Sequence, residues 1–562
     1  MCSDRDEIWP KPSLSPMYKY YQTALAADVG LCSEVGRNVQ ISGGNAVDAA
    51  IAIMICQGAL NAQSSGIGGG FFMSVYNKED GTCTIVDARE TAPANAHKDM
   101  FKDNTEGLLL TGWRAIAIPG EIHGMWTAHQ KFGKMEWARL FEQTIRLCEN
   151  GFPISETLSD ILADEFERGD VLTEENGLGI YINKDTGKPY TTGEIMKRQP
   201  LADTLRLLAE SSDPIELFYK GEIAQKLVED IGKGGGNITL ADLANYATVI
   251  RENPIFMDIV GTDLTICTPP PPSSGIILAT ILNILGGYKW NPSLLQTDIT
   301  TGDVLHKTVE AFKFAFAYRS QLGDVPEAQK IVDELSDMAN IDELRSQITN
   351  KAQDVSSYGG DYVSTADGGT THISAVDADG NAVSVTSTIN TYFGSQRRSK
   401  QTGIILNNQM DDFSTPGRTN AYGLEPSPVN FIEPGKKPMS SMSPSIFINK
   451  NTKEVELVVG ASGGSRIITS VASVALRVLW FNNTIKEAID APRLHNQLFP
   501  TTTLYEPDFP KVYVDMLKKM YGQNVTEDQP FELSTVAGIH KKGDVWYANS
   551  DKRKPGGNPA GF

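Results

Sequence analysis

The pattern of apolar and polar positions changes along the chain near residue 370. Before that point, long apolar runs predict mainly helices. The longest run, AVDAAIAIMICQGAL at residues 46–60, is apolar on nearly every face and predicts a buried helix. It is too short to cross a bilayer. Helical patterns also cover residues 120–149, with a break near Gly133, and residues 276–348.

Short strands are predicted on both sides of this point. Residues 71–77 and 82–90 flank the turn KEDG and predict a hairpin. A polar, glycine-rich stretch at 354–369 is the clearest boundary signal in the chain. The segments after it are predicted strands at 371–377, 381–389, 403–409, 445–450 and 454–460, and a helix at 465–480. Helix-rich followed by strand-rich sequence predicts an α+β fold, with helices packed on antiparallel sheets.

Composition and charge narrow the functional classes. The chain has 562 residues, of which 40% are hydrophobic and 21% charged, as in a globular protein. Its net charge is −19, which disfavours non-specific binding to nucleic acid. Residues 370–562 carry 20 Lys and Arg against 18 Asp and Glu, a net charge of +2, so residues 1–369 carry −21.

Cysteine and histidine positions give no metal-site pattern. All six cysteines precede residue 370 without a CxxC pair, and the histidines form no HxH or HxxxH pattern. The cysteines are therefore interpreted as buried or disulfide-linked. The first residues, MCSDRDEIWPKP, contain no apolar signal core, so the protein is cytosolic or a targeting segment is missing from this chain. Sequons at Asn237, Asn482 and Asn524 support secretion only weakly.

Three glycine-rich segments are candidate nucleotide or anion sites. GIGGG at 66–70 precedes a strand and lacks the third glycine of a dinucleotide fingerprint. IGKGGG at 231–236 lacks the Ser or Thr of a phosphate-binding loop. GASGGS at 460–465 lies between a strand and a helix, where consecutive N–H groups hold negative charge. A tight strand–helix turn is the alternative for this last segment.

Several polar residues are ambiguous when each is taken alone. Ser440 and Ser441 in PMSSMSPS fit a turn, and Arg89 beside Glu90 fits a surface ion pair. The segment NNQMDDF at 407–413 could bind an ammonium group or form a polar loop.

Thr370 stands at the start of a predicted strand, directly after the boundary segment. A threonine hydroxyl is a weak nucleophile, but cutting the bond to Gly369 would free an α-amine with a pKa of about 7.7–8.0 that can act as its base. His372 is an alternative base, but no Asp or Ser pattern completes a triad around it.

The segment GGTTHISAVDADGNAVSVTSTINTYFGS resembles the self-cleavage and nucleophile segment of the γ-glutamyltranspeptidases, also called glutathione hydrolases. Further matching segments follow the family's order: GGNAVDAAIA, GIGGGFF, ARETAP, PGEIHG, LNNQMDDFS, PMSSMSPSI, VVGASGG, APRLHNQL and GGNPAGF. The resemblance spans about residues 23–562. The segments YFGS, SPVNFIEPGK and RLHNQL are most similar to the animal-type branch of the family.

The resemblance implies an N-terminal-nucleophile hydrolase fold, a four-layer αββα sandwich with two central antiparallel sheets flanked by helices. It implies self-cleavage between Gly369 and Thr370 into a large fragment, 1–369, with a flexible processing segment at about 354–369, and a small fragment, 370–562. The two fragments would form a heterodimer, and no cofactor or metal is expected. Because every cysteine lies in the large fragment, an apolar interface alone is expected to hold the fragments together.

The resemblance also implies the catalytic roles. Thr370 is the implied nucleophile, Thr388 orients its α-amine, and the N–H groups of Gly463 and Gly464 form the oxyanion hole. The implied substrate-binding residues surround one zwitterionic glutamate: Arg89, Ser440 and Ser441 at its α-carboxylate, Asp412, Asn390 and Gln409 at its α-ammonium, and Tyr392 as a pocket wall or lid.

Some features depart from the family pattern. Gln409 stands where some mammalian members have Glu, so attraction of the ammonium group depends more on Asp412. Cys32 and Cys56 match a family disulfide, which implies an oxidising, extracellular compartment. A second vertebrate disulfide has no counterpart at 171–176. The membrane anchor of most animal members is absent, which predicts a secreted form or a trimmed chain.

The sequence is compatible with three hypotheses for the function of this chain. The first is an active γ-glutamyl hydrolase and transferase that acts on glutathione and its conjugates and passes the γ-glutamyl group to water, amino acids or dipeptides. The second is a catalytically silent, secreted binder of glutathione or glutamate. The third is a related acylase for another amide.

Overall fold

Two antiparallel sheets of seven strands form the centre of the protein. The computed structural model describes residues 9–14, 17–102, 110–360, 362–363, 369–417, 425–529 and 533–562. The strands of the first sheet are, in spatial order, β25 (Ala560–Gly561), β2 (Ala24–Ala27), β13 (Thr370–Val376), β14 (Ala382–Thr388), β3 (Gly70–Asn77), β4 (Thr82–Ala88) and β9 (Val249–Arg251). Those of the second are β1 (Tyr18–Tyr20), β24 (Val545–Ser550), β23 (Thr535–Lys542), β19 (Val455–Ser462), β18 (Ser445–Asn449), β11 (Leu264–Thr268) and β10 (Ile255–Asp258).

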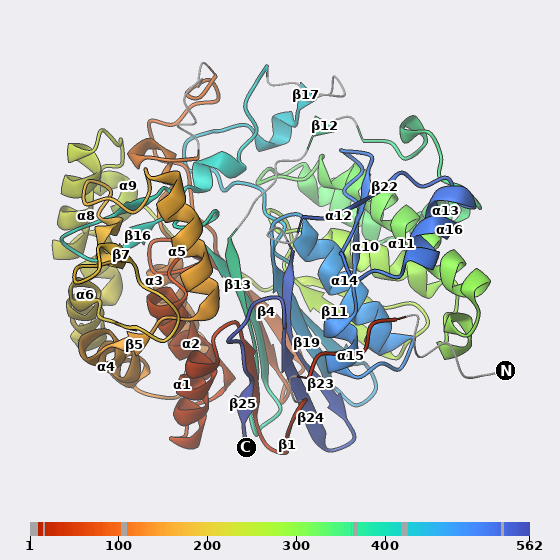
Figure 1. Ribbon diagram of the computed structural model, residues 1–562, viewed down its shortest axis with the longest axis horizontal. Coiled ribbons are helices and arrows are strands. Elements are labelled where there is room, and N and C mark those ends of the chain that lie inside the picture. Colours follow the sequence, from red (N-terminus) through yellow and green to blue (C-terminus); the bar gives the residue numbers. More distant parts are fainter. Residues whose placement is uncertain are drawn as a thin grey trace.

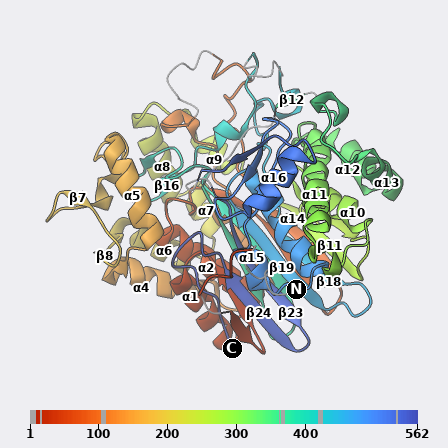
Figure 2. The same ribbon diagram turned by 45° about the vertical axis from the view of Figure 1, so that its right-hand side comes forward.

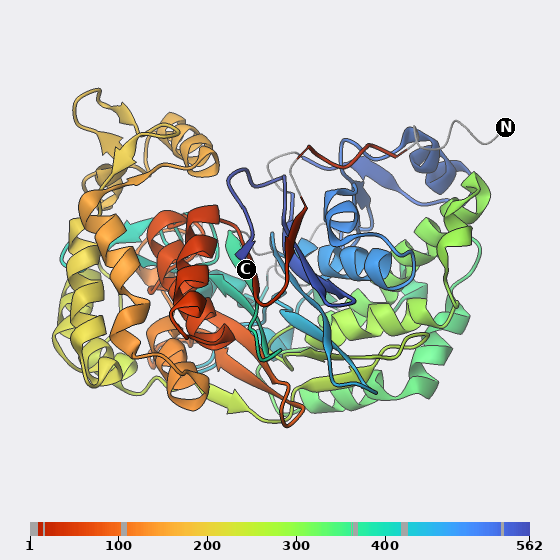
Figure 3. The same ribbon diagram turned by 90° about the horizontal axis from the view of Figure 1, so that it is seen from below.

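Helices cover the outer face of each sheet (Figures 1 and 3). On the side of the first sheet lie α1 (Gly30–Ile41), α2 (Ala46–Leu60), α3 (Glu121–Phe132), α4 (Glu142–Asn150), α5 (Glu156–Arg168), α6 (Gln199–Glu210), α7 (Pro214–Tyr219), α8 (Glu222–Lys233) and α9 (Leu240–Ala244). On the side of the second lie α10 (Gly275–Gly286), α11 (Asp298–Arg319), α12 (Ala328–Ser336), α13 (Met338–Gln347), α14 (Arg466–Leu479), α15 (Ile485–Asp490) and α16 (Lys511–Lys519).

Apolar side chains fill all three spaces between these layers. One cluster joins the first sheet to α1–α8, a second joins the second sheet to α10–α15, and a third lies between the sheets. Figure 2 shows α10, α11, α12 and α13 grouped on the side of β11 and β18. The predicted four-layer αββα sandwich is therefore confirmed.

Most elements predicted near the centre are present. The apolar run at 46–60 forms α2, whose side chains are nearly all buried and whose N-terminus is capped by Asn45. Both predicted hairpins form, as β3–β4 and β13–β14. The strand predicted at 403–409 is wrong, because only Ile405–Leu406 (β16) is extended and a 3₁₀ turn follows at Gln409–Asp412 (η6).

Strands from before and after residue 370 pair with each other in both sheets. In the first sheet, β13 and β14 lie between β2 and β3, which come from the N-terminal part of the chain. In the second, β18 pairs with β11 and β24 pairs with β1. Backbone ladders therefore join the two parts, so the expectation that apolar contacts alone hold them was incomplete.

Two disulfides are present in the N-terminal part. Cys32–Cys56 joins α1 to α2, as the resemblance implied. Cys83–Cys267 was not anticipated, and it joins β4 of the first sheet to β11 of the second. Cys148 is a free, buried thiol. Among the described residues, no helix is both long and apolar enough to cross a membrane.

Candidate active site

The two threonines of the predicted catalytic pair lie directly opposite each other. Thr370 is the first residue of β13 and Thr388 the last of β14. The Thr370 hydroxyl donates to Oγ1 of Thr388 at 3.2 Å. Thr388 in turn donates to the carbonyl oxygen of Gly369 at 2.7 Å and accepts from the backbone N–H of Asn390 at 2.8 Å. In this uncut chain, one hydroxyl thus touches both the predicted nucleophile and the carbonyl it would attack.

His372, the alternative base, lies in the space between the two sheets. Its ring nitrogens contact the hydroxyls of Thr386 at 2.8 Å and Ser374 at 3.0 Å. The ring also packs on Gly460 of β19, where a Cβ atom would lie only 2.3 Å from it. Burial lowers the pKa of His372 to about 3, so the imidazole is neutral at physiological pH. These contacts support a packing role.

Gly463 and Gly464 form the turn between β19 and α14. Their φ angles are +111° and +61°, a backbone region that favours glycine. A Cβ atom on Gly463 would also lie 2.7 Å from Cα of Ser534. The predicted strand–turn–helix arrangement is confirmed, and Gly463 lines the same cavity as Thr370.

A cavity of about 200 Å³ opens in front of Thr370. Tyr392 forms part of its wall and is 40% exposed. Sequence reasoning missed four charged residues of the lining, because nothing in the local pattern links them to Thr370. They are Asp160 and Asp164 on α5 and Arg553 and Lys554 near the C-terminus.

Arg89 follows the last residue of β4 and is completely buried, so the surface-ion-pair interpretation is wrong. Its guanidinium is paired with Asp412 and lies 3.5 Å from Oε2 of Glu90. It also donates to the carbonyl oxygens of Pro438 and Met439, each at 3.3 Å. Burial raises the pKa of Glu90 to about 7, although Arg89 opposes the shift.

Amide side chains extend this cluster toward Thr388. Gln409 donates to Oδ2 of Asp412 at 2.7 Å. Asn390, whose N–H bonds Thr388, donates from its side chain to the carbonyl oxygen of Asn408 at 3.3 Å. Oε1 of Gln409 and Oδ1 of Asn390 are buried and accept no hydrogen bond from the described residues. The free acceptor of Gln409, whose amide contacts Asp412, makes a suitable lining for an ammonium group.

The two serines follow the segment that Arg89 contacts, and both are buried. Oγ of Ser440 accepts from the N–H of Met442 at 3.1 Å. Oγ of Ser441 accepts from Arg319 at 2.7 Å. Arg319 comes from the last turn of α11 and was missed, because its position there resembles that of an ordinary helix-ending cation.

Six of the predicted residues thus form one connected group: Thr370, Thr388, Asn390, Gln409, Asp412 and Arg89. A chain of hydrogen bonds and adjacent residues leads from Thr370 through Thr388 and Asn390 to Asp412 and Arg89. One end offers the hydroxyl of Thr370, and the other offers a paired cation and anion. This arrangement suits an acyl donor that carries both a carboxylate and an ammonium group.

Comparisons with known proteins identify the family to which the chain is similar. The model of the family described as gamma-glutamyltranspeptidase matches residues 32–561. Scoloptoxin SSD14 from Scolopendra dehaani is 41% identical over 541 residues, covering 96% of this chain and 92% of that protein. Glutathione hydrolase 2 from Arabidopsis thaliana is 38% identical over 566 residues, covering 96% and 94%.

The fold also matches a solved structure over its whole length. The crystal structure of a cephalosporin acylase from Bacillus halodurans superposes with a TM-score of 0.84 and 25% sequence identity, covering 99% of this chain and 98% of that one. The family match and the full-length relatives agree with the motifs, and the chain belongs to the γ-glutamyltranspeptidase family.

Proposed function

We propose that this chain is a self-processing glutathione hydrolase and γ-glutamyltransferase that works through Thr370. The observation that carries the proposal is the contact of one Thr388 hydroxyl with both Thr370 Oγ1 and the Gly369 carbonyl, in a chain of this family. Glutathione and its conjugates are the proposed donors. The full-length relatives named glutathione hydrolases support this choice.

Self-cleavage is the proposed first step. Thr370 Oγ attacks the Gly369 carbonyl carbon, and the C–N bond breaks. The peptide nitrogen takes up the hydroxyl proton and leaves as the α-amine of Thr370, so that an ester joins the Gly369 carbonyl to Thr370 Oγ. Water then hydrolyses this ester, giving a carboxylate at Gly369 and a free N-terminal threonine. The donation from Thr388 supports the step, because it stabilises negative charge on the carbonyl oxygen.

The mature site then repeats the chemistry on the substrate. The α-amine of Thr370 takes the hydroxyl proton as Oγ attacks the γ-carbonyl carbon of glutathione. The same group returns the proton to the leaving amine, and a γ-glutamyl ester on Thr370 remains. Attack by water gives glutamate, and attack by an amino acid or dipeptide gives a new γ-glutamyl amide. Backbone N–H groups of Gly463 and Gly464 are the proposed oxyanion hole. Gly463 lines the same cavity as Thr370 and Gly464 follows it in the turn before α14, which supports this assignment.

The γ-glutamyl group is proposed to lie between Arg89 and Asp412. These two side chains pair with each other in the structure, so a zwitterion inserted between them satisfies both charges: its carboxylate faces Arg89 and its ammonium faces Asp412. The proposed carboxylate partners also include Ser440 and Ser441. Asn390 and Gln409 are the remaining ammonium partners, and Tyr392 is a wall of the site near the reacting bond.

A heterodimer of fragments 1–369 and 370–562 is the proposed mature form, as the proenzyme names of several relatives suggest. We further propose that it acts outside the cell. The two disulfides support an oxidising compartment.

A related acylase activity is the second candidate, favoured by the fold match to the cephalosporin acylase. The buried Arg89–Asp412 pair supports the γ-glutamyl donor instead, because an acyl group without an α-ammonium leaves Asp412 unmatched. A silent binding protein has less support, since the nucleophile Thr370 is retained.

Purified protein tests these alternatives directly. Denaturing electrophoresis and N-terminal sequencing should show two fragments, the smaller beginning at Thr370, and Thr370→Ala should remain a single inactive chain. The mature protein should hydrolyse γ-glutamyl anilide much faster than glutaryl anilide, which lacks the α-amine. An intact wild-type chain that hydrolyses glutathione would exclude the proposed mechanism, and a preference for the glutaryl substrate would favour an acylase.

A further inference from the structure

The catalytic hairpin has a rear face that the proposed mechanism does not use. Side chains alternate between the two faces of a strand, so the neighbours of Thr370 and Thr388 face the helix layer. These neighbours are Thr371 and Ser387, which lie directly opposite each other in the antiparallel register. Both carry hydroxyl groups, and both are buried.

Thr371 is held by two buried side chains, Asp28 directly after β2 and Gln57 on α2. Its hydroxyl donates to Oδ2 of Asp28 at 2.9 Å and also contacts Oε1 of Gln57, in the last turn of α2. The Asp28 carboxylate also accepts from Nζ of Lys554 at 2.7 Å. The position of β13 just after its first residue is therefore fixed from two directions.

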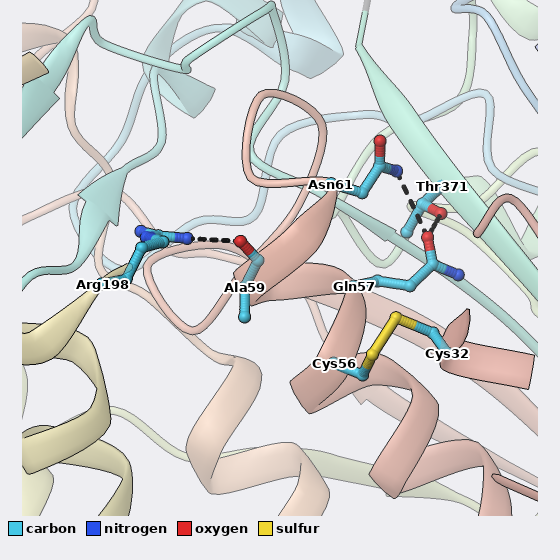
Figure 4. The surroundings of a disulfide bond; sticks show 7 residues. All are labelled: Cys32, Cys56, Gln57, Ala59, Asn61, Arg198 and Thr371. Atoms are coloured by element: carbon cyan, nitrogen blue, oxygen red, sulfur yellow. Dashed lines mark hydrogen bonds between the residues drawn. A yellow bond between two sulfur atoms is a disulfide. The ribbon is translucent and has the colours of Figure 1, made fainter. Parts of the chain in front are cut away.

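The Cys32–Cys56 disulfide links the two segments that hold Thr371. Cys56 immediately precedes Gln57, and Cys32 lies in the first turn of α1, four residues after Asp28. Figure 4 shows the disulfide beside Gln57, with the amide of Gln57 reaching Thr371 on the neighbouring strand. One covalent bond thus braces both partners of the Thr371 hydroxyl.

Ser387 has a matching partner on α3. Its hydroxyl donates to Oε2 of Glu121 at 2.9 Å, and Glu121 is the completely buried first residue of that helix. The backbone N–H of Glu121 donates to the carbonyl oxygen of Gly69 at 3.1 Å, which ties the helix start to the residue before β3. The end of β14 is therefore fixed to α3, as the start of β13 is fixed to α2.

The contacts at the front of the hairpin need such support. The ladder between β13 and β14 ends at Thr370 and Thr388, where the reacting hydroxyl must stay aligned with its target. A displacement of about 1 Å at a reacting group can lower a rate by roughly 100-fold. We propose that Thr371 and Ser387, held by Asp28, Gln57 and Glu121, are positioning residues that fix the Thr370–Thr388 pair from behind. The inference rests on the proposed function.

Two substitutions remove the rear contacts and leave the front face unchanged. Thr371→Val and Ser387→Ala should each slow self-cleavage and lower kcat of the mature enzyme for γ-glutamyl anilide by about 10- to 100-fold. KM should stay within about twofold, because neither side chain faces the proposed glutamate site. Thr371→Ser keeps the hydroxyl and should restore both rates to within about threefold of wild type. Should Thr371→Val fail to fold, Ser387→Ala removes a single oxygen atom and gives the same readout.

Ser384→Ala is the matched control. Ser384 lies on the same strand, is buried, and donates to the carbonyl oxygen of Val459 at 3.2 Å, on the face toward the second sheet. This variant should process and turn over substrate at wild-type rates, and its thermal midpoint calibrates the loss of one buried hydroxyl.

The outcomes distinguish failure of the positioning role from failure of the proposed function. If wild type is active while Thr371→Val and Ser387→Ala match Ser384→Ala, the positioning role is wrong and the proposed function stands. The positioning role is equally wrong if kcat is unchanged and KM rises, because the residues would then shape the binding site. If wild type itself neither cuts nor hydrolyses the anilide, the proposed function fails and this inference fails with it.

Discussion

Replacing Thr388 by valine removes one oxygen atom from the centre of the candidate site while keeping the side chain's shape. That oxygen donates to the Gly369 carbonyl at 2.7 Å and accepts from Thr370 at 3.2 Å and from the N–H of Asn390 at 2.8 Å. The substitution therefore breaks three buried contacts at once, and each loss has a different measurable effect.

The largest effect is expected on self-cleavage. Negative charge develops on the Gly369 oxygen as Thr370 attacks, so the donation from Thr388 strengthens in the transition state. Removing one such donor raises a barrier by roughly 2.7–4 kcal/mol, or about 100- to 1,000-fold in rate. Leaving the N–H of Asn390 buried and unpaired should lower the free energy of unfolding by only about 1–3 kcal/mol.

The assay follows conversion of freshly purified precursor into two fragments by denaturing electrophoresis over time. Thr386→Val is the matched control, because Thr386 lies two residues earlier on the same face of β14 and its hydroxyl contacts His372 rather than Gly369. Thr388→Val should convert about 100-fold or more slowly than this control. Equal rates for the two variants, or a wild-type rate for Thr388→Val, would refute the role of Thr388 in stabilising the scissile carbonyl.

Three further predictions concern the binding site, pH and stability. Arg89→Lys should raise KM for γ-glutamyl anilide by about 10- to 100-fold, because an ammonium cannot replace both arms of a buried guanidinium; an unchanged KM would remove Arg89 from the site. Burial raises the pKa of Glu90 to about 7, so ionisation above that pH sets its carboxylate against the substrate carboxylate for Arg89. KM should therefore rise between pH 6 and 8, and Glu90→Gln should flatten this dependence of KM on pH. The pKa of Glu90 is higher in the folded state than in the unfolded state. Its contribution to the free energy of unfolding should therefore fall as pH rises from about 4.5 to about 7. Replacing Cys83 and Cys267 by alanine opens a loop of 184 residues and should lower the free energy of unfolding by at most about 5 kcal/mol. Self-cleavage should persist, because the disulfide lies at the end of the sheet opposite Thr370 and Thr388.

The hairpin that carries the catalytic pair could be predicted from the sequence. Alternating apolar and small polar residues on both sides of a DG turn fix the strands at 371–377 and 381–389, and the turn then sets Thr370 opposite Thr388. The helix at 46–60 was equally clear, because a long apolar run with a capping Asn45 has few alternatives.

The remaining features depend on contacts between distant parts of the chain. Arg89 next to Glu90 has the local signature of a surface pair, and its burial follows only from partners more than 300 residues away, such as Asp412. The pairing of Cys83 with Cys267 likewise cannot be predicted from the sequence around either cysteine. The sequence predicts a strand over 403–409, whereas β16 covers only Ile405–Leu406, because periodicity alone does not show where a buried segment turns.

The pairing of strands from before and after residue 370 determines how the two proposed fragments can assemble and dissociate. Once the bond to Gly369 is cut, β13 and β14 still lie between β2 and β3, so the two chains can part only if both sheets come apart. Dissociation and global unfolding then become the same event, and reassembly becomes a second-order search between two incomplete halves. Cleavage would thus convert a precursor that folds as one chain into a dimer that unfolds irreversibly. The rate of unfolding would then set the lifetime of the folded dimer. The proposed cut must therefore follow folding, and each mature copy would be assembled once.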